Sequence, residues 1–177
     1  MNQYRVFGFV MAGLIGLFLS VGDVDAADLK RIMIFEMEDQ DGKKRTHKDL
    51  MGKIVMLIGA DKEGSEYTKA WIMAIQKGLD EHEDAEPVEV IPAPQLGSVP
   101  KLMRGTVKKF IAKDAERWLL LDWESKFTKA YGLKPGTANI VLFDAKGNVI
   151  HKIAKKKVEP KLVEKIIEEV AELQKEK

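Results

Sequence analysis

The sequence predicts an α/β protein, a three-layer α/β/α sandwich with a mixed central sheet. Three observations indicate this class. An unbroken apolar run over residues 54–58 is typical of a central strand that is covered on both faces. Further along, predicted strands and helices alternate as far as residue 131. Two strands joined by a tight turn, followed by a terminal amphipathic helix, complete the pattern.

The first half of the domain is expected to contain three strands and one helix. The first strand covers residues 30–38, with apolar side chains on both faces at its centre, and ends in the turn residues 39–42. After the central strand, Ser65 is expected to cap a helix whose apolar positions recur at three- and four-residue steps. A third strand over 88–91 is expected to end where prolines enter at 92–94.

A second helix is expected to open at Pro100. Its apolar positions share one face: Met103, Val107, Phe110 and Ile111. A short strand over 118–121 and a brief helix over 123–131 should follow, and Gly132 is suited to end that helix.

The remaining elements are a hairpin and a helix. The two strands of the hairpin are predicted over 139–143 and 149–153, with turn residues between them. The last helix begins at Pro160 and carries one apolar stripe, with charged residues elsewhere. No internal repeat or low-complexity linker interrupts the sequence, so we expect one domain over 27–177.

Composition excludes several classes of function. The chain has 177 residues, no cysteine, 29 basic and 28 acidic side chains, and a net charge of +1. Disulfides, thiol chemistry and Cys-ligated zinc or iron–sulfur centres all require a sulfur that is absent. The balanced charge argues against nucleic acid as a partner, because phosphate neutralisation needs a basic excess.

The N-terminal segment predicts export. An apolar run over 6–21 follows Arg5 and leads to Ala26, an order typical of a secretory signal peptide over 1–26 that is cleaved after Ala26. The expected location is the bacterial periplasm. A retained membrane anchor is the alternative, and contact with a membrane would then be made only through this uncleaved segment.

Three stretches resemble the redoxin branch of the thioredoxin-like fold, which includes exported TlpA-like thiol proteins and peroxiredoxins. Residues 35–43 and 48–55 are similar to the D-x-D-G-K turn and L-x-G-K step that lead to the central strand of redoxins. Residues 120–122 with 130–133 are similar to the redoxin LLD and AYGV stretches. Residues 141–150 are similar to the redoxin hairpin FLID-x-x-G-x-I. The resemblance therefore implies a thioredoxin-like domain.

The same resemblance implies that the redox site is missing. The positions that match the two redoxin cysteines are Glu63 and Glu66, and the position of the redoxin cis-proline falls near Ala138. A carboxylate cannot perform thiol–disulfide exchange, so neither a thiol oxidoreductase nor a cysteine peroxidase is expected. The chain is most similar to the cysteine-free YtfJ-type periplasmic proteins, a resemblance that implies fold and compartment but no activity.

The resemblance leads to a non-catalytic binding or structural module whose partner is another envelope protein. If the ancestral face is reused, the contact surface consists of seven residues: Asp61, Lys62, Glu63, Ser65, Glu66, Thr137 and Ala138. No cofactor or metal is expected, because the acidic spacing matches no known calcium loop and the three histidines lie in separate elements.

Two alternatives stay open. The carboxylates of the loop 61–66 could form a cation site or a general acid–base pair in a non-thiol or metal-dependent enzyme. The chain could also serve as an accessory subunit of a thiol oxidoreductase that supplies the cysteines. The sequence predicts neither the partner nor the oligomeric state.

Overall fold

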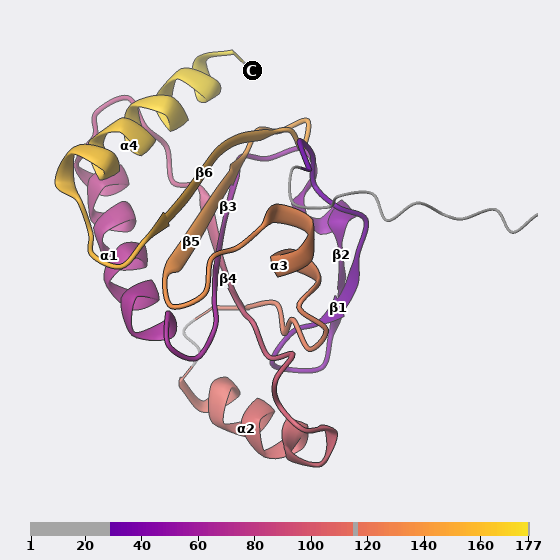
Figure 1. Ribbon diagram of the computed structural model, residues 1–177. Helices are drawn as coiled ribbons and strands as arrows, with labels where there is room; N and C mark the ends of the chain where they lie inside the picture. Colours follow the sequence, from indigo (N-terminus) through magenta and orange to yellow (C-terminus); the bar gives the residue numbers. More distant parts are fainter. Residues whose placement is uncertain (1–28, 115–116, 177) are drawn as a thin grey trace, which may run out of the picture.

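A four-stranded mixed sheet forms the centre of the protein. The computed structural model describes residues 29–114 and 117–176 (Figure 1), so the predicted signal peptide 1–26 lies outside the described residues. The strand order is β4-β3-β5-β6. Strand β3 (Val55–Ala60) pairs in parallel with β4 (Glu89–Pro94) and antiparallel with β5 (Ala138–Phe143), which also pairs antiparallel with β6 (Val149–Lys155).

Helices cover both faces of this sheet. Helices α1 (Ser65–Glu81) and α4 (Pro160–Lys175) lie on one face (Figure 1). On the other face lie α3 (Lys126–Tyr131) and an antiparallel pair formed by β1 (Glu36–Glu38) and β2 (Lys44–Thr46). Separate apolar clusters fill the two sides, with Trp71 at the centre of one and Phe127 in the other. The predicted three-layer α/β/α class is confirmed.

Several predicted elements form where local sequence signals were strong. Strand β3 is buried along its whole length, as the apolar run indicates. Gly132 ends α3 with φ of 61°, a left-handed conformation that glycine adopts without steric cost. Pro160 occupies the first turn of α4, where its missing N–H breaks no helical hydrogen bond.

The prediction that prolines end the third strand is wrong. Strand β4 includes Pro92 and Pro94, which is possible because β4 is the edge strand. The carbonyl oxygens of these two prolines point away from β3 and accept the N–H groups of Leu120 at 2.9 Å and Asp122 at 3.2 Å. The backbone nitrogens of these prolines also face away from β3, so their missing N–H groups remove no hydrogen bond from the β3–β4 pair.

The N-terminal strand is shorter than predicted. Strand β1 covers only Glu36–Glu38, and β2, which the sequence analysis did not predict, pairs with it. Ile34 is exposed while Phe35 and Met37 are buried, so one face of this segment packs on the core and the other faces solvent. The segment 118–121 likewise forms only an isolated bridge at Leu120 rather than a strand.

Two helix starts also differ from the predictions. Gly64, not Ser65, precedes α1 as its cap residue, and the Ser65 hydroxyl instead donates to the carbonyl of Lys62 at 2.7 Å. Helix α3 begins at Lys126 rather than at residue 123. Asp122 explains the delay, because its carboxylate accepts the N–H groups of Lys126 at 2.7 Å and Phe127 at 2.9 Å.

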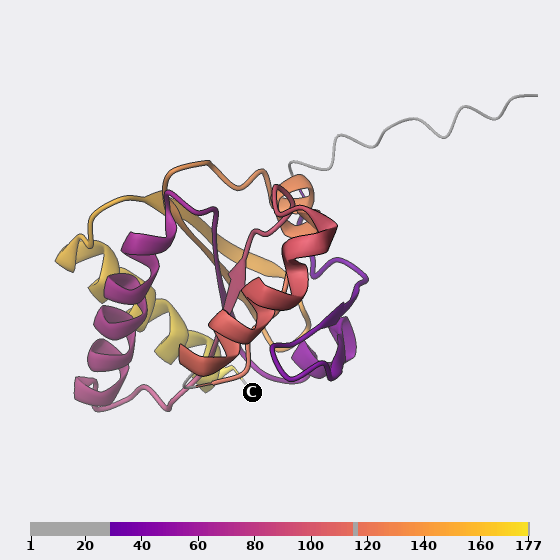
Figure 2. The ribbon, with the colours of Figure 1, turned by 90° about the horizontal axis from the view of Figure 1, so that it is seen from below.

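Helix α2 (Arg104–Asp114) packs less closely than the other helices. It follows a short 3-10 turn at Lys101–Met103 and is set apart from the layers that cover the sheet (Figures 1 and 2). Its predicted apolar face is only partly covered, since Val107 and Ile111 are half-buried whereas Phe110 is 74% exposed. The space between α2 and α1 is therefore a feature of the surface rather than of the core.

Candidate functional site

Asp61 connects the two loops that flank the N-terminus of α1. Its carboxylate accepts the N–H of Gly64 at 2.8 Å and the N–H of Gly136 at 3.0 and 3.1 Å. Its carbonyl oxygen accepts the N–H of Ser65 at 2.9 Å. Hydrogen bonds to a carboxylate are stronger than neutral ones, so Asp61 holds the start of α1 against the segment before β5.

Gly64 allows these two loops to approach closely. A Cβ atom at this position would lie 2.3 Å from the carbonyl oxygen of Thr137, inside the van der Waals contact distance. A residue with any side chain would push the segment before β5 away from α1. The absence of a side chain at Gly64 therefore allows the segment before β5 to come close enough for Asp61 to bond the N–H groups of both Gly64 and Gly136.

Asn139, near the start of β5, holds the segment 134–137 in place by side-chain hydrogen bonds. Its side chain is buried, accepts the N–H of Lys134 at 2.7 Å, and donates to the carbonyl oxygens of Lys134 at 2.9 Å, Thr137 at 3.2 Å and Gly59 at 3.3 Å. All peptide bonds in the described part of the chain are trans, including the one before Ala138. The turn is thus shaped by an asparagine network at the place where redoxins use a cis-proline.

The structure brings most of the predicted site residues to one end of the sheet. Four of them, which sit in the loop and the first turn of α1, are exposed: Lys62, Glu63, Ser65 and Glu66. Thr137 and Asp61 are half-buried beside them. Ala138 is fully buried and packs in the cluster under α1, so its side chain is not part of a contact surface.

The carboxylates of this loop do not converge on one point. Asp61 faces backbone N–H groups, and Glu66 is hydrogen-bonded to the Tyr67 hydroxyl, an interaction that raises the pKa of Tyr67. Across residues 29–114 and 117–176, no three His, Asp or Glu side chains are grouped so that they could hold a metal ion. The Glu63 side chain is exposed and leans toward Gly136, so the three carboxylates have different partners.

Next to this loop lies a groove of about 790 Å³ that the sequence analysis did not predict. Helix α1 forms one wall, α2 forms the other, and the edge strand β4 with its inner neighbour β3 forms the floor. Ser65 and Thr68 line its end at the start of α1, so the groove is continuous with the loop 61–66. Of the signals available in the sequence, the apolar face predicted for the helix after Pro100 was the one that could have indicated it.

A family model described as the AhpC/TSA family matches residues 30–152, more than half of the chain. The chain belongs to the AhpC/TSA family. The redoxin resemblance is confirmed by this match, whereas the finer likeness to YtfJ-type proteins stays a prediction. A search of the curated proteins found no match.

Solved structures of thioredoxin-like proteins resemble this AhpC/TSA family member. The exposed lipoprotein thioredoxin Etrx1 of Streptococcus pneumoniae is 19% identical, with a TM-score of 0.58 over 77% of this chain and 99% of that chain. A SCO1/SenC family lipoprotein of Bacillus anthracis is 24% identical, with a TM-score of 0.59 over 81% and 95%. A secreted thiol-disulfide isomerase of Corynebacterium glutamicum is 11% identical, with a TM-score of 0.55 over 80% and 85%. At these identities the likeness shows the fold alone.

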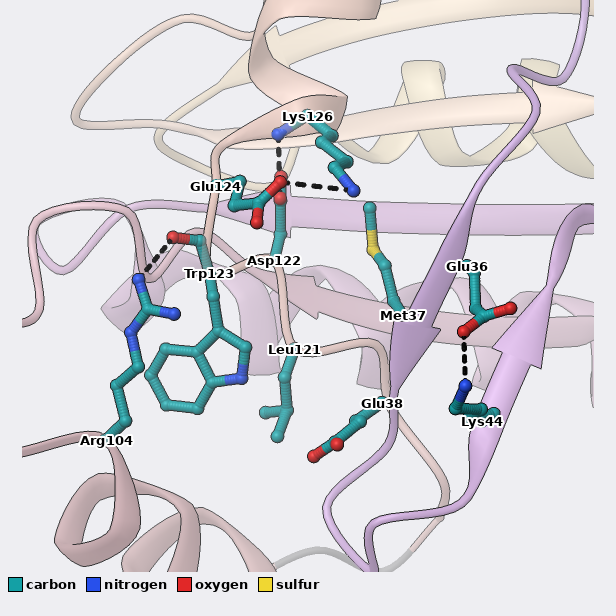
Figure 3. Close-up of a pocket in the computed structure, with 10 residues that line it drawn as sticks. All are labelled: Glu36, Met37, Glu38, Lys44, Arg104, Leu121, Asp122, Trp123, Glu124 and Lys126. Atoms are coloured by element: carbon teal, nitrogen blue, oxygen red, sulfur yellow. Dashed lines mark hydrogen bonds and ion pairs between the residues drawn. The ribbon is translucent and has the colours of Figure 1, made fainter. Parts of the chain in front are cut away.

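This AhpC/TSA domain has a second, smaller hollow of about 210 Å³ between the β1–β2 pair and the segment before α3 (Figure 3). Charged groups around it pair with one another, as Glu36 does with Lys44 at 2.7 Å. Burial raises the pKa of Asp122, although its carboxylate is hydrogen-bonded by the first N–H groups of α3. The carboxylate of Asp122 in this hollow therefore serves to hold the start of α3, and the pair Glu36–Lys44 joins β1 to β2.

Proposed function

We propose that this chain is an exported member of the AhpC/TSA family that binds another protein of the bacterial envelope and performs no thiol chemistry. The signal-like segment over 1–26 supports export, as does the likeness to structures described as lipoproteins and as a secreted protein. Within the described part of the chain, no helix has the length and hydrophobicity needed to cross a membrane.

The observation that carries the proposal is the state of the loop between β3 and α1. The loop contains glutamates where redoxins carry cysteines, yet Asp61 and Gly64 hold it firmly against the segment before β5. Ordering a surface loop costs conformational entropy when the protein folds. A loop that is already ordered loses less entropy when it binds a partner, which favours binding. The loop and the adjoining groove together form the proposed binding face.

The enzyme alternative receives less support from this geometry. A general acid–base pair requires two carboxylates that face a shared substrate position. Asp61 is hydrogen-bonded to backbone N–H groups instead, the exposed Glu63 leans toward Gly136, and the exposed Glu66 is hydrogen-bonded to the Tyr67 hydroxyl. An accessory role beside a thiol oxidoreductase is one form of the proposed function, and the identity of the bound protein would reveal it.

Affinity capture from envelope extract tests the proposal. Four tagged baits are compared: the unmodified protein, a loop variant (K62S/E63S/E66S), a groove variant (F110S) and a control variant (K146S/E168S/E172S) whose replaced residues are exposed and lie in the β5–β6 turn and on α4. We expect the unmodified and control baits to recover the same protein, and the loop or groove variant to lose it. Capture that survives in both variants would overturn the proposal, provided that circular dichroism shows all four baits folded.

A further inference from the structure

We propose that the groove between α1 and α2 is the docking site for an acidic amphipathic helix of the partner protein. This inference rests on the proposed function, because it takes the chain to be a protein-binding module. It adds the surface that makes the contact and the chemistry of the segment that fills it.

The floor and the walls of the groove are apolar. Ile58 from the inner strand β3, Pro92 from the edge strand β4 and Leu119 from the segment beside that edge contribute to the floor. Met73 on α1 and Phe110 on α2 line the groove, and they are 59% and 74% exposed. Large apolar side chains that remain this exposed on both walls of one groove mark an interaction site rather than a normal surface.

The ionisable side chains that line the groove are both cationic. Lys69 and Arg117 are the only ionisable side chains among the described residues that line it. Lys69 forms no ion pair within the described part of the chain. Lys113 does not line the groove, but it is exposed one turn beyond Phe110 on the same side of α2 and places a further cation near it, next to Asp114 at the helix end. A segment that fills this groove therefore gains from acidic residues beside its apolar face.

The dimensions of the groove suit a helix. Helix α2 has 11 residues and is therefore about 16 Å long, which matches three turns of a docked helix. Recognition of this kind uses apolar anchors at i, i+3, i+4 and i+7 that enter a groove between helices. The same spacing leaves the flanks of the docked helix free to place carboxylates toward Lys69 and Lys113.

An anionic membrane fits the observations less well. A membrane-surface helix presents its cations outward, but two cations of α2 are engaged by the protein itself. Arg104 donates to the carbonyl oxygen of Trp123 at 3.3 Å and lies 5.2 Å from the centre of its ring, and Lys108 pairs with Glu38 at 3.0 Å. The exposed apolar side chains also line a concave surface, which a flat bilayer does not fill.

Designed peptides test the charge preference directly. Three fluorescent helical peptides of about 14 residues share a leucine face at i, i+3, i+4 and i+7 and differ only in flanking Glu, Gln or Lys. Fluorescence anisotropy with the full-length protein should give an affinity for the Glu peptide at least about tenfold higher than for the Lys peptide. The difference should shrink in about 0.5 M salt, because screening weakens the interaction between exposed charges.

Matched variants locate the binding. K69E should weaken the Glu peptide about tenfold, whereas K77E, also on α1 but outside the groove, should leave its affinity unchanged. F110S should weaken all three peptides, whereas L102S should not, although Leu102 is 96% exposed. Circular dichroism and thermal unfolding confirm that each variant is folded.

Three results would overturn the inference: equal affinity for the Glu and Lys peptides, equal effects of K69E and K77E, or binding to phosphatidylglycerol vesicles without binding to the Glu peptide. The proposed function would survive any of these results if the capture experiment still gives a partner that depends on the loop 62–66. If all four baits instead recover the same proteins in the same amounts, the proposed function is wrong, whatever the peptides show.

Discussion

Asp61 accepts the backbone N–H of Gly136 at 3.0 Å, which joins two loops that are 75 residues apart in the sequence. One of these loops carries the thiols in redoxins and the other carries the cis-proline. In this chain a carboxylate spans the gap between them. The end of the sheet is therefore an ordered surface without the groups of a redox site.

We predict that Asp61→Ala lowers the free energy of unfolding by about 2 kcal/mol, because it leaves the N–H groups of Gly64 and Gly136 without their charged acceptor. Urea unfolding measures the change. Glu63→Ala is the matched control in the same loop, and its exposed side chain predicts a change within about 0.5 kcal/mol. Equal effects of the two substitutions would show that Asp61 does not hold the loops together.

Gly64→Ala should destabilise the protein by about 1–3 kcal/mol, since the added methyl group would meet the carbonyl oxygen of Thr137. The control is Gly105→Ala in α2, where nothing lies within 4 Å of an added Cβ. That substitution should be neutral or stabilise by up to about 1 kcal/mol, because alanine is the better helix former. Thermal unfolding of both variants checks the prediction, which fails if Gly64→Ala is as stable as the unmodified protein.

The Tyr131 hydroxyl ties the N-terminal segment to α3. Burial raises the pKa of Tyr131 to about 12, so the hydroxyl keeps its proton at neutral pH. It donates to the carbonyl of Arg31 at 3.2 Å and accepts the N–H of Met33 at 2.7 Å. Tyr131→Phe should cost about 1–2 kcal/mol of stability and speed hydrogen exchange at Met33. Unchanged exchange at Met33 would contradict this assignment.

Asp39 should make stability depend on pH. Burial alone would raise the pKa of Asp39, but hydrogen bonds from the Arg45 side chain and from the N–H groups of Lys43 and Asp41 hold it below its usual 3.8. A carboxyl with a lower pKa in the folded state stabilises the protein above its unfolded-state pKa. This contribution is lost as the pH falls through the folded-state pKa.

Asp39→Asn should therefore lower the free energy of unfolding by about 1–3 kcal/mol at pH 7. The difference in free energy of unfolding between this variant and the unmodified protein should become smaller below about pH 4. Urea unfolding at pH 7 and pH 3 measures both values. Asp41→Asn, at an exposed neighbouring position, serves as the control. If the difference in free energy of unfolding between Asp39→Asn and the unmodified protein is the same at pH 7 and pH 3, the ionised carboxylate of Asp39 does not stabilise the fold.

Elements with long, regular patterns could be predicted from the sequence, and features that depend on tertiary neighbours could not. Helix α1, strand β3 and the hairpin β5–β6 follow from local periodicity and turn residues. The prolines of β4 were misinterpreted because the sequence does not reveal that their strand lies at an edge. Strand β2, with only three residues, is too short to give a pattern.

The candidate site was predictable in part for the same reason. The redoxin resemblance located the loop 61–66, and the structure brings that loop against Thr137 as expected. The bonds of Asp61 to Gly136 could not be foreseen, because they depend on the packing of distant loops. The groove depends on how far α2 lies from α1, a distance that no local pattern encodes.

We propose that this thiol-free domain acts by binding a partner at the α1–α2 groove. Photo-crosslinking in the producing cells tests this, with p-benzoylphenylalanine placed at position 110 or at position 102 of the full chain. We predict one discrete adduct from position 110 and none from position 102, although Leu102 is the more exposed of the two residues. Equal adducts from both positions, or no adduct from position 110, would contradict the claim.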